Sequence, residues 1–507
     1  MNKLYILAAG LLALLAAACN KDDSTAAGPI AQLKVTGLKD TFTVIAHQDF
    51  LTSTPTVENE NDYDYYWTLF STEFNAATGA TLIKPDTLAR TKDLNYEVVQ
   101  DPGAYILVFN AKEKSTGVVK QVNMVANITT LTLNGWYLVK DNGGKTDMDF
   151  IYPTENPVNR IDNWIAYYNG GKSLNGNAVS AVFAPSFRTS ITSQKYFPVL
   201  IVASQNDAAI YRIDNGAMQL NFDNMFFTKP AVRRPQSVFQ PANTTALGFI
   251  NDGRAYNMTK GALFANLPVA YNGATYGNLS SITASAALDL GFDNTRKSVF
   301  VFNGISYLEL KVLVSNGVNN GLGKLQNVNG NLQWMTGYTG SSSQALVLFR
   351  NPQDTGYLYK VDGRYGQLFY GTPFTTGGKI VTIADTLKPQ HGLMNASAIG
   401  GNYDVDLIYY AVGSSIYKMD VTTTTESLQY TLPAGETVTA IQHIRYPETA
   451  PTVNSIAIAT YNAGHYKVYL HPLSGTQTLL LTQPSFQGDG RVSRVIYMKN
   501  GVGSRVY

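Results

Sequence analysis

Short apolar segments alternate with turn residues along most of the chain, and within each segment the apolar positions recur with a period of two. In the first part, Tyr65, Trp67 and Leu69 share one face of such a segment. Strands are predicted at Leu33–Val35, Phe42–Ala46, Tyr63–Phe70, Asn95–Val99, Ala104–Asn110 and Val118–Val125. Their spacing of about ten residues predicts a small β-sandwich over residues 31–130.

A different unit recurs over residues 134–507: an apolar strand, a polar turn, and a second strand that reads aliphatic-Tyr-basic-aliphatic-Asp. The clear copies are Val199–Ala203 with Ile210–Asp214, Ala345–Phe349 with Leu358–Asp362, and Leu407–Ala411 with Ile416–Asp420. Weaker copies are Leu247–Ile250 with Ala255–Met258, Val299–Phe302 with Ser306–Leu310, and Ile456–Thr460 with Tyr466–Tyr469. Trp136–Val139 with Phe150–Tyr152, and Val495–Met498 with Arg505–Tyr507, bracket the series.

The repeat has a period near fifty residues, because its tyrosines fall at positions 152, 211, 256, 307, 359, 417, 466 and 507. Paired strands at that period, without a helical pattern, predict a β-propeller. Eight hairpins allow eight blades, or seven if the first and last hairpins complete one blade. Seven is favoured because sharing a blade between the two chain ends removes the free edges. An irregular tandem sandwich is the alternative. The repeat tyrosines are expected to pack between blades.

The N-terminal residues 1–19 form a signal peptide: Lys3, an apolar stretch from Leu4 to Ala17, and small residues before Cys19. That stretch is shorter than the roughly 20 residues of a membrane span. The small residues followed by cysteine resemble a bacterial lipobox, although Ala16 stands where the motif usually has a larger aliphatic residue. The resemblance implies an acylated Cys19 anchored in outer-membrane lipid. An ordinary secretory signal with an incidental cysteine is the alternative.

Residues 20–30 carry no periodic apolar pattern and are predicted to form a flexible tether. Lys21, Asp22 and Asp23 follow the cysteine closely. A lysine and two acids at this place resemble the surface-export signal of lipoproteins in one Gram-negative phylum, which implies display on the cell surface. A generic polar tether is the alternative.

The amino-acid composition excludes several classes of partner and site. Charged residues make up 15% of the chain and the net charge is +2, so a nucleic-acid partner is not expected. A single cysteine excludes an intramolecular disulfide and a multi-cysteine metal site. The abundance of glycine (43), tyrosine (32) and phenylalanine (22) is typical of an all-β protein.

Motifs for catalysis are missing from the sequence. The five histidines form no helical pair of the metalloprotease type, and there is no Gly-x-Ser-x-Gly elbow, phosphate loop or dinucleotide fingerprint. The stretch from Asp141 to Gly144, with Asp147 and Asp149, is interpreted as an acidic hairpin tip, for which calcium binding and a plain turn are the alternatives. No catalytic residue, metal ligand or cofactor is therefore assigned.

Aromatic residues in two long insertions are the candidate ligand-binding residues: Trp164, Tyr167, Tyr168, Trp334 and Tyr338. Flat aromatic rings flanked by amides suit stacking on sugar rings or anchoring of a peptide. Local core beneath a loop is the alternative for both groups.

The first domain resembles polycystic-kidney-disease-type (PKD-like) domains in its Tyr65-Tyr66-Trp67 strand and its Pro102-Gly103-Ala104-Tyr105 turn. The resemblance implies that Trp67 is a core tryptophan and Tyr105 a corner tyrosine. With the lipobox and the Lys-Asp-Asp sequence, the chain resembles PKD-like family lipoproteins that accompany starch-utilisation-type TonB-dependent transporters and their partner lipoproteins.

That resemblance implies a non-catalytic accessory role in nutrient uptake, with a glycan or an oligopeptide as ligand. A polysaccharide-degrading propeller hydrolase or lyase, and a structural or adhesion lipoprotein of the envelope, are the alternatives.

Overall fold

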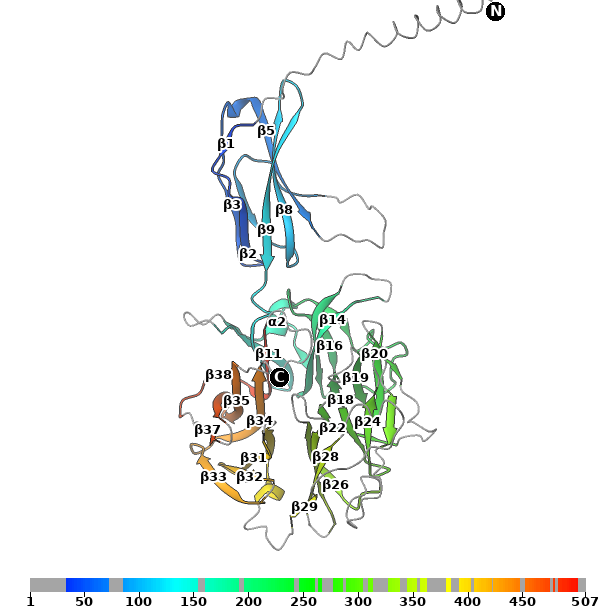
Figure 1. Ribbon diagram of the computed structural model, residues 1–507. Helices are drawn as coiled ribbons and strands as arrows, with labels where there is room; N and C mark the ends of the chain where they lie inside the picture. The colour runs from blue at the N-terminus through cyan, green and yellow to red at the C-terminus, as the bar shows by residue number, and fades with distance from the viewer. Residues whose placement is uncertain are drawn as a thin grey trace, which may run out of the picture. The chain divides into compact units, whose positions relative to one another are not determined.

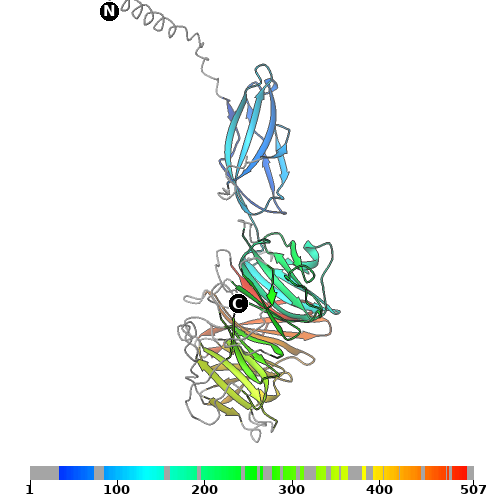
Figure 2. The same cartoon turned by 90° about the vertical axis from the view of Figure 1, so that its right-hand side faces the viewer.

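The computed structural model divides into two compact units, Met1–Thr129 and Thr130–Tyr507, each described by itself (Figures 1 and 2). It describes residues 33–72, 85–153, 160–190, 196–240, 246–259, 263–266, 277–285, 289–303, 309–312, 327–337, 344–352, 356–362, 380–383, 392–402, 405–421, 423–446, 452–474, 477–478 and 482–499. Within these ranges, no helix is both long and apolar enough to cross a membrane.

The first unit contains a five-stranded sheet in the order β2-β9-β8-β5-β6, in which β2 runs parallel to β9 and the other pairs are antiparallel. Its strands are β2 (Thr41–Ile45), β5 (Tyr63–Ser71), β6 (Asp86–Ala89), β8 (Gly103–Glu113) and β9 (Val119–Thr129). Two strand pairs complete the unit: β1 (Val35–Thr36) with β4 (Thr56–Val57), and β3 (Phe50–Ser53) with β7 (Leu94–Glu97). A short 3-10 helix, η1 (Glu60–Asp62), precedes β5.

The core of this unit lies between the five-stranded sheet and the two strand pairs, as in a β-sandwich. Trp67 is fully buried, contacts Phe109 with ring centroids 4.9 Å apart, and donates its indole N–H to the Lys92 carbonyl at 3.0 Å. The Tyr105 hydroxyl donates to the Asp101 carbonyl at 2.7 Å. The predicted core tryptophan and corner tyrosine are both confirmed.

The second unit contains seven sheets in the described part of the chain, numbered here as blades in chain order. The first blade joins β39 (Arg491–Met498) to β10 (Gly135–Asn142), β11 (Lys145–Ile151) and β12 (Arg160–Ile161), with β13 (Leu174–Asn175) beside β11. The second has β14 (Ala178–Phe187), β15 (Phe197–Ser204), β16 (Ala208–Arg212) and β17 (Met218–Asn221). The third has β18 (Pro235–Phe239), β19 (Ala246–Asn251), β20 (Arg254–Thr259) and β21 (Ala265–Asn266).

The remaining blades repeat the same antiparallel order. The fourth has β22 (Leu279–Ser285), β23 (Asp289–Asp293), β24 (Ser298–Asn303) and β25 (Glu309–Val312). The fifth has β26 (Asn331–Gly337), β27 (Gln344–Arg350), β28 (Gly356–Asp362) and β29 (Ile380–Ile383). The sixth, preceded by the 3-10 helix η4 (Gly392–Asn395), has β30 (Ala398–Asn402), β31 (Leu407–Val412), β32 (Ser415–Asp420) and β33 (Glu426–Thr431). The seventh has β34 (Thr437–Tyr446), β35 (Val453–Asn462), β36 (His465–Ser474), β37 (Gln477–Thr478) and β38 (Phe486–Asp489).

The blades form a closed ring, because the end strands β39, β14, β18, β22, β26, β30 and β34 contact one another in that order and β34 returns to β39. β39 pairs with β10 from Gly135–Met498 to Asp141–Arg491, so both ends of this unit share one blade (Figure 2). An all-β propeller with a shared blade is thereby confirmed. The predicted last hairpin strand, Arg505–Tyr507, lies outside the described residues.

Apolar clusters fill the space between neighbouring blades. Tyr211 packs between the first and second blades, Tyr256 between the second and third, and Tyr466 between the seventh and first, as expected for the repeat tyrosines. One repeat assignment was wrong: the described part of the pair predicted at 299–302 and 306–310 lies in the third and fourth strands of its blade, because β23 precedes it. In the other blades the repeated hairpin consists of the second and third strands.

Candidate functional site

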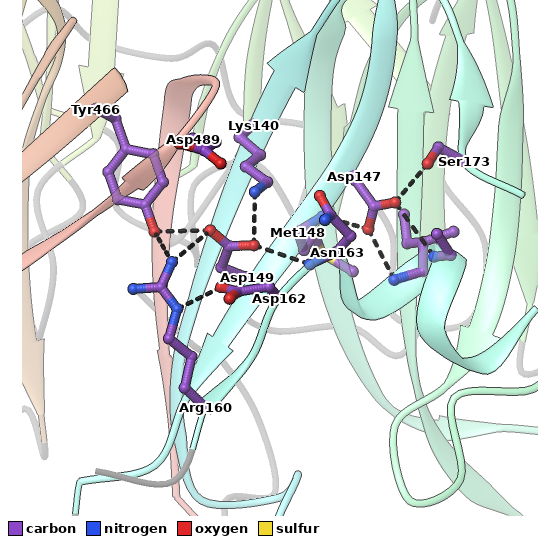
Figure 3. A network of polar contacts seen from close by, with 12 residues as sticks. Lys140, Asp147, Met148, Asp149, Arg160, Asp162, Asn163, Ser173, Tyr466 and Asp489 are labelled. Atoms are coloured by element: carbon purple, nitrogen blue, oxygen red, sulfur yellow. Dashed lines mark hydrogen bonds and ion pairs between the residues drawn. The ribbon is translucent and has the colours of Figure 1, made fainter. Parts of the chain in front are cut away.

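The candidate site lies at α2 (Trp164–Tyr168), a one-turn helix in the insertion between β12 and β13. The carboxylate of Asp147, on β11, accepts the N–H groups of Ile165 at 2.8 Å and Ala166 at 3.2 Å, and the Ser173 hydroxyl at 2.5 Å (Figure 3). A carboxylate at the first turn satisfies amides that have no partner within the helix. Asp147 therefore fixes both the start of α2 and the segment that follows it.

Burial raises the pKa of Asp147, and the hydrogen bonds from Ser173, Met148 and the helix amides offset only part of that effect. Its oxygens face protein donors on β11, α2 and the segment after α2. This arrangement gives Asp147 a structural role in holding the insertion.

Trp164 anchors the helix α2 to the core between the first and second blades. Its side chain has no exposed surface and contacts Tyr137 and Tyr211 edge-on, with ring centroids 5.6 Å and 6.2 Å apart. Among the described residues its indole N–H has no hydrogen-bond partner. The structure therefore places Trp164 in the core between the first two blades, which corrects the expectation that it faces a ligand.

Tyr168 and Asn169 join α2 to the second blade. The Asn169 side chain donates to the Gly216 carbonyl at 3.0 Å and accepts the Met218 N–H at 3.1 Å. Gly216 has a φ of +67°, and a β-carbon there would lie 2.1 Å from the Tyr168 ring, so this glycine allows the close approach. Burial raises the pKa of Tyr168 to about 12. Both residues fix the end of α2.

Tyr167 is the member of the predicted aromatic group that faces solvent. It is 67% exposed and rests edge-on against Tyr168 at 4.9 Å. Met218, whose backbone Asn169 holds, is 46% exposed. We call Tyr167, Tyr168, Asn169 and Met218 the α2 surface. This fixed patch presents an aromatic ring and a thioether to a partner, while the Asn169 amide is bonded to backbone groups.

A buried polar network supports the α2 surface from the side of the seventh blade (Figure 3). Asp149, fully buried on β11, accepts the Lys140 ammonium at 2.7 Å and the Asn163 N–H at 2.9 Å on one oxygen. The other oxygen accepts the Tyr466 hydroxyl at 2.7 Å and the Arg160 guanidinium at 3.1 Å. Burial, together with the nearby Asp149 carboxylate, raises the pKa of Tyr466 well above its usual range.

The network links the first blade to the seventh blade by side-chain hydrogen bonds and ion pairs, in addition to the strand pairing that closes the ring. Arg160, on β12 of the first blade, donates to the Tyr466 hydroxyl at 2.9 Å and to the Gln487 carbonyl at 2.6 Å, both in the seventh blade. Arg160 also pairs with Asp162, so two cations face two carboxylates. Ion pairing of this kind offsets part of the free-energy cost of burying the charges of Lys140 and Asp149.

The predicted acidic hairpin tip was wrong in part. The turn lies between β10 and β11, but Asp147 and Asp149 lie within β11 and point toward the insertion, where protein donors occupy their oxygens. In the described ranges, no group of three or more His, Cys, Asp or Glu side chains is placed to hold a metal ion.

Of the second predicted aromatic group, only Trp334 lies within the described residues, and it does not lie in a loop. Trp334 lies on the strand β26, is half-buried, and packs against the cluster between the fifth and sixth blades. Tyr338 lies outside the described residues, as do Cys19, Lys21, Asp22 and Asp23. Ligand binding at the remaining accessible position, Tyr167, stays a prediction.

The family comparison concerns the N-terminal third of the chain. Residues 23–177 match the PKD-like family. The match covers the β-sandwich and continues through β13 of the first blade and the α2 insertion. The first unit is thus a PKD-like sandwich, as its Tyr-x-Trp strand and corner tyrosine indicated. A comparison with curated proteins finds no match.

Solved structures give distant neighbours. A quinoprotein alcohol dehydrogenase-like protein from Bacteroides thetaiotaomicron has 12% identity and a TM-score of 0.43, covering 93% of this chain and 100% of that one. The extracellular domain of a one-component system protein from the same organism has 10% identity and a TM-score of 0.34, covering 92% of this chain and 69% of that one. The WD40 domain of SCAP from fission yeast has 7% identity and a TM-score of 0.33, covering 60% and 69%. The fold assignment therefore rests on the strand pairing.

Proposed function

We propose that the protein is a lipoprotein of the outer membrane, held by acyl chains on Cys19 and displayed at the cell surface, where the propeller binds a nutrient without transforming it. The anchor is supported by the only cysteine of the chain, which follows three alanines at the end of an uncharged apolar stretch. A chain with several acyl groups on one residue stays in the membrane, since each buried CH₂ contributes about 0.8 kcal/mol.

The binding role is supported by the α2 surface. Four features hold it in place before any ligand arrives: the Asp147 cap, the Trp164 anchor, the Asn169 bridge and the contact of Tyr168 with Gly216. A fixed, exposed aromatic residue such as Tyr167 loses little conformational freedom on binding, which favours affinity. A non-catalytic role is supported by Asp147 and Asp149, whose oxygens bind protein donors.

The partner in this proposal is a TonB-dependent transporter with its companion lipoproteins, and the ligand is a glycan or an oligopeptide. Such a component has to present a surface rather than a reaction centre. The α2 surface meets that requirement because its exposed groups are apolar or neutral.

Two experiments test the proposal. Metabolic labelling with a clickable palmitate should mark the wild-type protein and not Cys19→Ser, and proteinase added to intact cells should degrade the wild-type protein. Co-purification from detergent-solubilised outer membranes should recover a β-barrel transporter with the wild-type protein, and less of it with Tyr167→Ala. Tyr196→Ala, at an exposed tyrosine directly before β15 of the second blade, is the matched control. An unlabelled wild-type protein released from the periplasm by osmotic shock contradicts the anchor.

A further inference from the structure

An asparagine that is followed by glycine readily loses its side-chain amide. The backbone nitrogen of the glycine can attack the asparagine Cγ, and glycine has no β-carbon to shield that nitrogen. The chain contains eleven Asn-Gly pairs. Six of them have both residues in the described part of the chain, and their asparagines are Asn134, Asn142, Asn169, Asn175, Asn215 and Asn329. Folding decides which of the six can react, because bonded or buried groups are withdrawn from the reaction.

Hydrogen bonds hold the side chain in three of the six pairs. The Asn169 amide is bonded to backbone groups of α2 and of the second blade. The Asn175 side chain accepts the Lys145 ammonium group. The Asn215 side chain accepts the Ala217 N–H at 3.1 Å. Each of these side chains must give up its bonds before its Cγ can turn toward the next backbone nitrogen, and breaking them costs free energy.

The glycine nitrogen is withdrawn in three of the pairs. Gly176 donates its N–H to the Gly144 carbonyl at 2.7 Å, and Gly330 donates to the Val328 carbonyl at 2.9 Å. Gly135 is buried within the paired strand β10. Five of the six described pairs are therefore restrained at the side chain, at the attacking nitrogen, or at both.

The sixth pair, Asn142 with Gly143, has neither restraint. Asn142 ends β10 and is exposed, and Gly143 and Gly144 form the turn to β11 at φ values of +56° and +73°. Among the described residues, neither the Asn142 side chain nor the Gly143 N–H has a hydrogen-bond partner. A β-carbon on Gly143 would meet no atom within 4 Å, so the hairpin tip has room for the side chain to turn.

We propose that Asn142 is a site of spontaneous deamidation, at which the protein gains a negative charge as it ages. The Gly143 nitrogen, after giving its proton to hydroxide, forms a bond to the Asn142 Cγ, and the side-chain nitrogen leaves as ammonia. Water then opens the resulting succinimide ring. Cleavage of the bond between nitrogen and Cγ gives aspartate, and cleavage of the bond between nitrogen and the main-chain carbonyl carbon gives isoaspartate. The net reaction consumes one water and releases one ammonia.

The product changes both the charge and the length of the hairpin tip. The new carboxylate stands opposite Lys145, the strand partner of Asn142, and directly after Asp141. Isoaspartate also adds a carbon atom to the main chain next to a two-residue turn, whose length sets the strand register. Because Gly144 accepts the Gly176 N–H, we expect the Gly176 amide to exchange its hydrogen faster in the isoaspartate form.

The test follows the six pairs in the full-length protein, purified in detergent and aged at mildly alkaline pH. Peptide mapping by mass spectrometry, with fragmentation that separates aspartate from isoaspartate, gives the rate at each pair. The protein unfolded in guanidinium chloride is the control for sequence, because each asparagine then has the same glycine neighbour and no fold around it. Gly143→Ala places a β-carbon beside the attacking nitrogen. Gly144→Ala, also at a positive φ and in open space, is the matched control for backbone strain.

In the folded protein, Asn142 should react about tenfold or more faster than each of the other five described asparagines, since the loss of a hydrogen bond or of burial changes a rate by a factor of that order. In guanidinium chloride the six rates should lie close together. Gly143→Ala should remove most of the reaction at Asn142, and Gly144→Ala should not. The proposal is overturned if another described pair reacts first in the folded protein, or if Asn142 stays an amide while the unfolded control reacts. It is also overturned if Asn142 leads equally in the unfolded protein, or if both alanine variants slow it to the same extent.

Discussion

Replacing Asp149 by asparagine tests whether the polar network closes the propeller. Asp149 and Lys140 are both buried, at 0% and 2% side-chain exposure, and the Lys140 Nζ lies 2.7 Å from the Asp149 Oδ1. An asparagine keeps the shape but removes the charge, and its NH₂ group faces the donors of Arg160 or Tyr466. Leaving a buried cation without its counter-ion costs about 3–5 kcal/mol. We expect Asp149→Asn to lower the free energy of unfolding of the propeller by that amount.

The assay is urea unfolding followed by circular dichroism and tryptophan fluorescence. Trp136 reports on the junction, because it packs against Tyr497 at 4.7 Å and Phe486 at 5.6 Å in the cluster between the seventh and first blades. The double variant Lys140→Met/Asp149→Leu should recover at least half of the loss, because it removes both charges together.

A matched control separates the buried pair from an exposed one. Asp162 also binds Arg160, but its side chain is 59% exposed. Asp162→Asn should cost less than about 1 kcal/mol. If Asp149→Asn unfolds within about 0.5 kcal/mol of wild type, or if Asp162→Asn costs as much, the network does not hold the ring closed and the argument is wrong.

Three further outcomes are expected. Burial lowers the pKa of His471 from 6.5 to about 4, so the neutral form is favoured in the folded state. The free energy of unfolding should therefore fall by about 3 kcal/mol as the pH drops from 6.5 to 4. Urea titrations at each pH measure this loss, and His471→Gln should largely remove it. Gly216→Val forces a β-carbon into Tyr168 at a positive φ and should cost about 2–4 kcal/mol, measured by urea unfolding, with local loosening of α2 seen as faster hydrogen exchange. Trp67→Ala should cost the sandwich about 3–5 kcal/mol in urea unfolding and leave the unfolding transition of the propeller in place.

The architecture could be predicted because the second and third strands of most blades are buried on both faces. β15 and β31 are continuous apolar runs for this reason, and their repetition at a fixed period is visible in the sequence. The end strands of the ring are more polar, and β26, with Asn331, Gln333 and Thr336, was interpreted as part of a loop. The fourth blade was misaligned because β23 reads Asp-Leu-Gly-Phe-Asp, which is too short and polar for an apolar run.

The supporting network could not be predicted, since its members have no shared spacing. Arg160 and Tyr466 are 306 positions apart, and Asp149 and Tyr466 are 317 apart. Period-two patterns place Asp147 and Asp149 on one face of a strand, but an acid on a strand face is normally exposed. The available signal was Asp-x-Asp next to buried apolar residues, which the sequence alone could not separate from an ion-binding turn.

The junctions between blades differ in the chemistry that holds them, and the difference follows from chain connectivity. Between the second and third blades the cluster is apolar and aromatic, with Phe226, Phe249 and Phe264 in mutual contact, and the chain itself connects these blades. The first blade contains strands from both ends of this unit, so β39 must pair with β10, which lies at the other end of the unit's sequence. Apolar packing tolerates alternative registers, whereas buried charges do not, because each misplaced ion leaves another unpaired. The chain connects the seventh blade directly only to β39, so the Asp149 network supplies the register between the seventh blade and the strands β10, β11 and β12. Asp147, two positions before Asp149 on β11, holds the α2 surface.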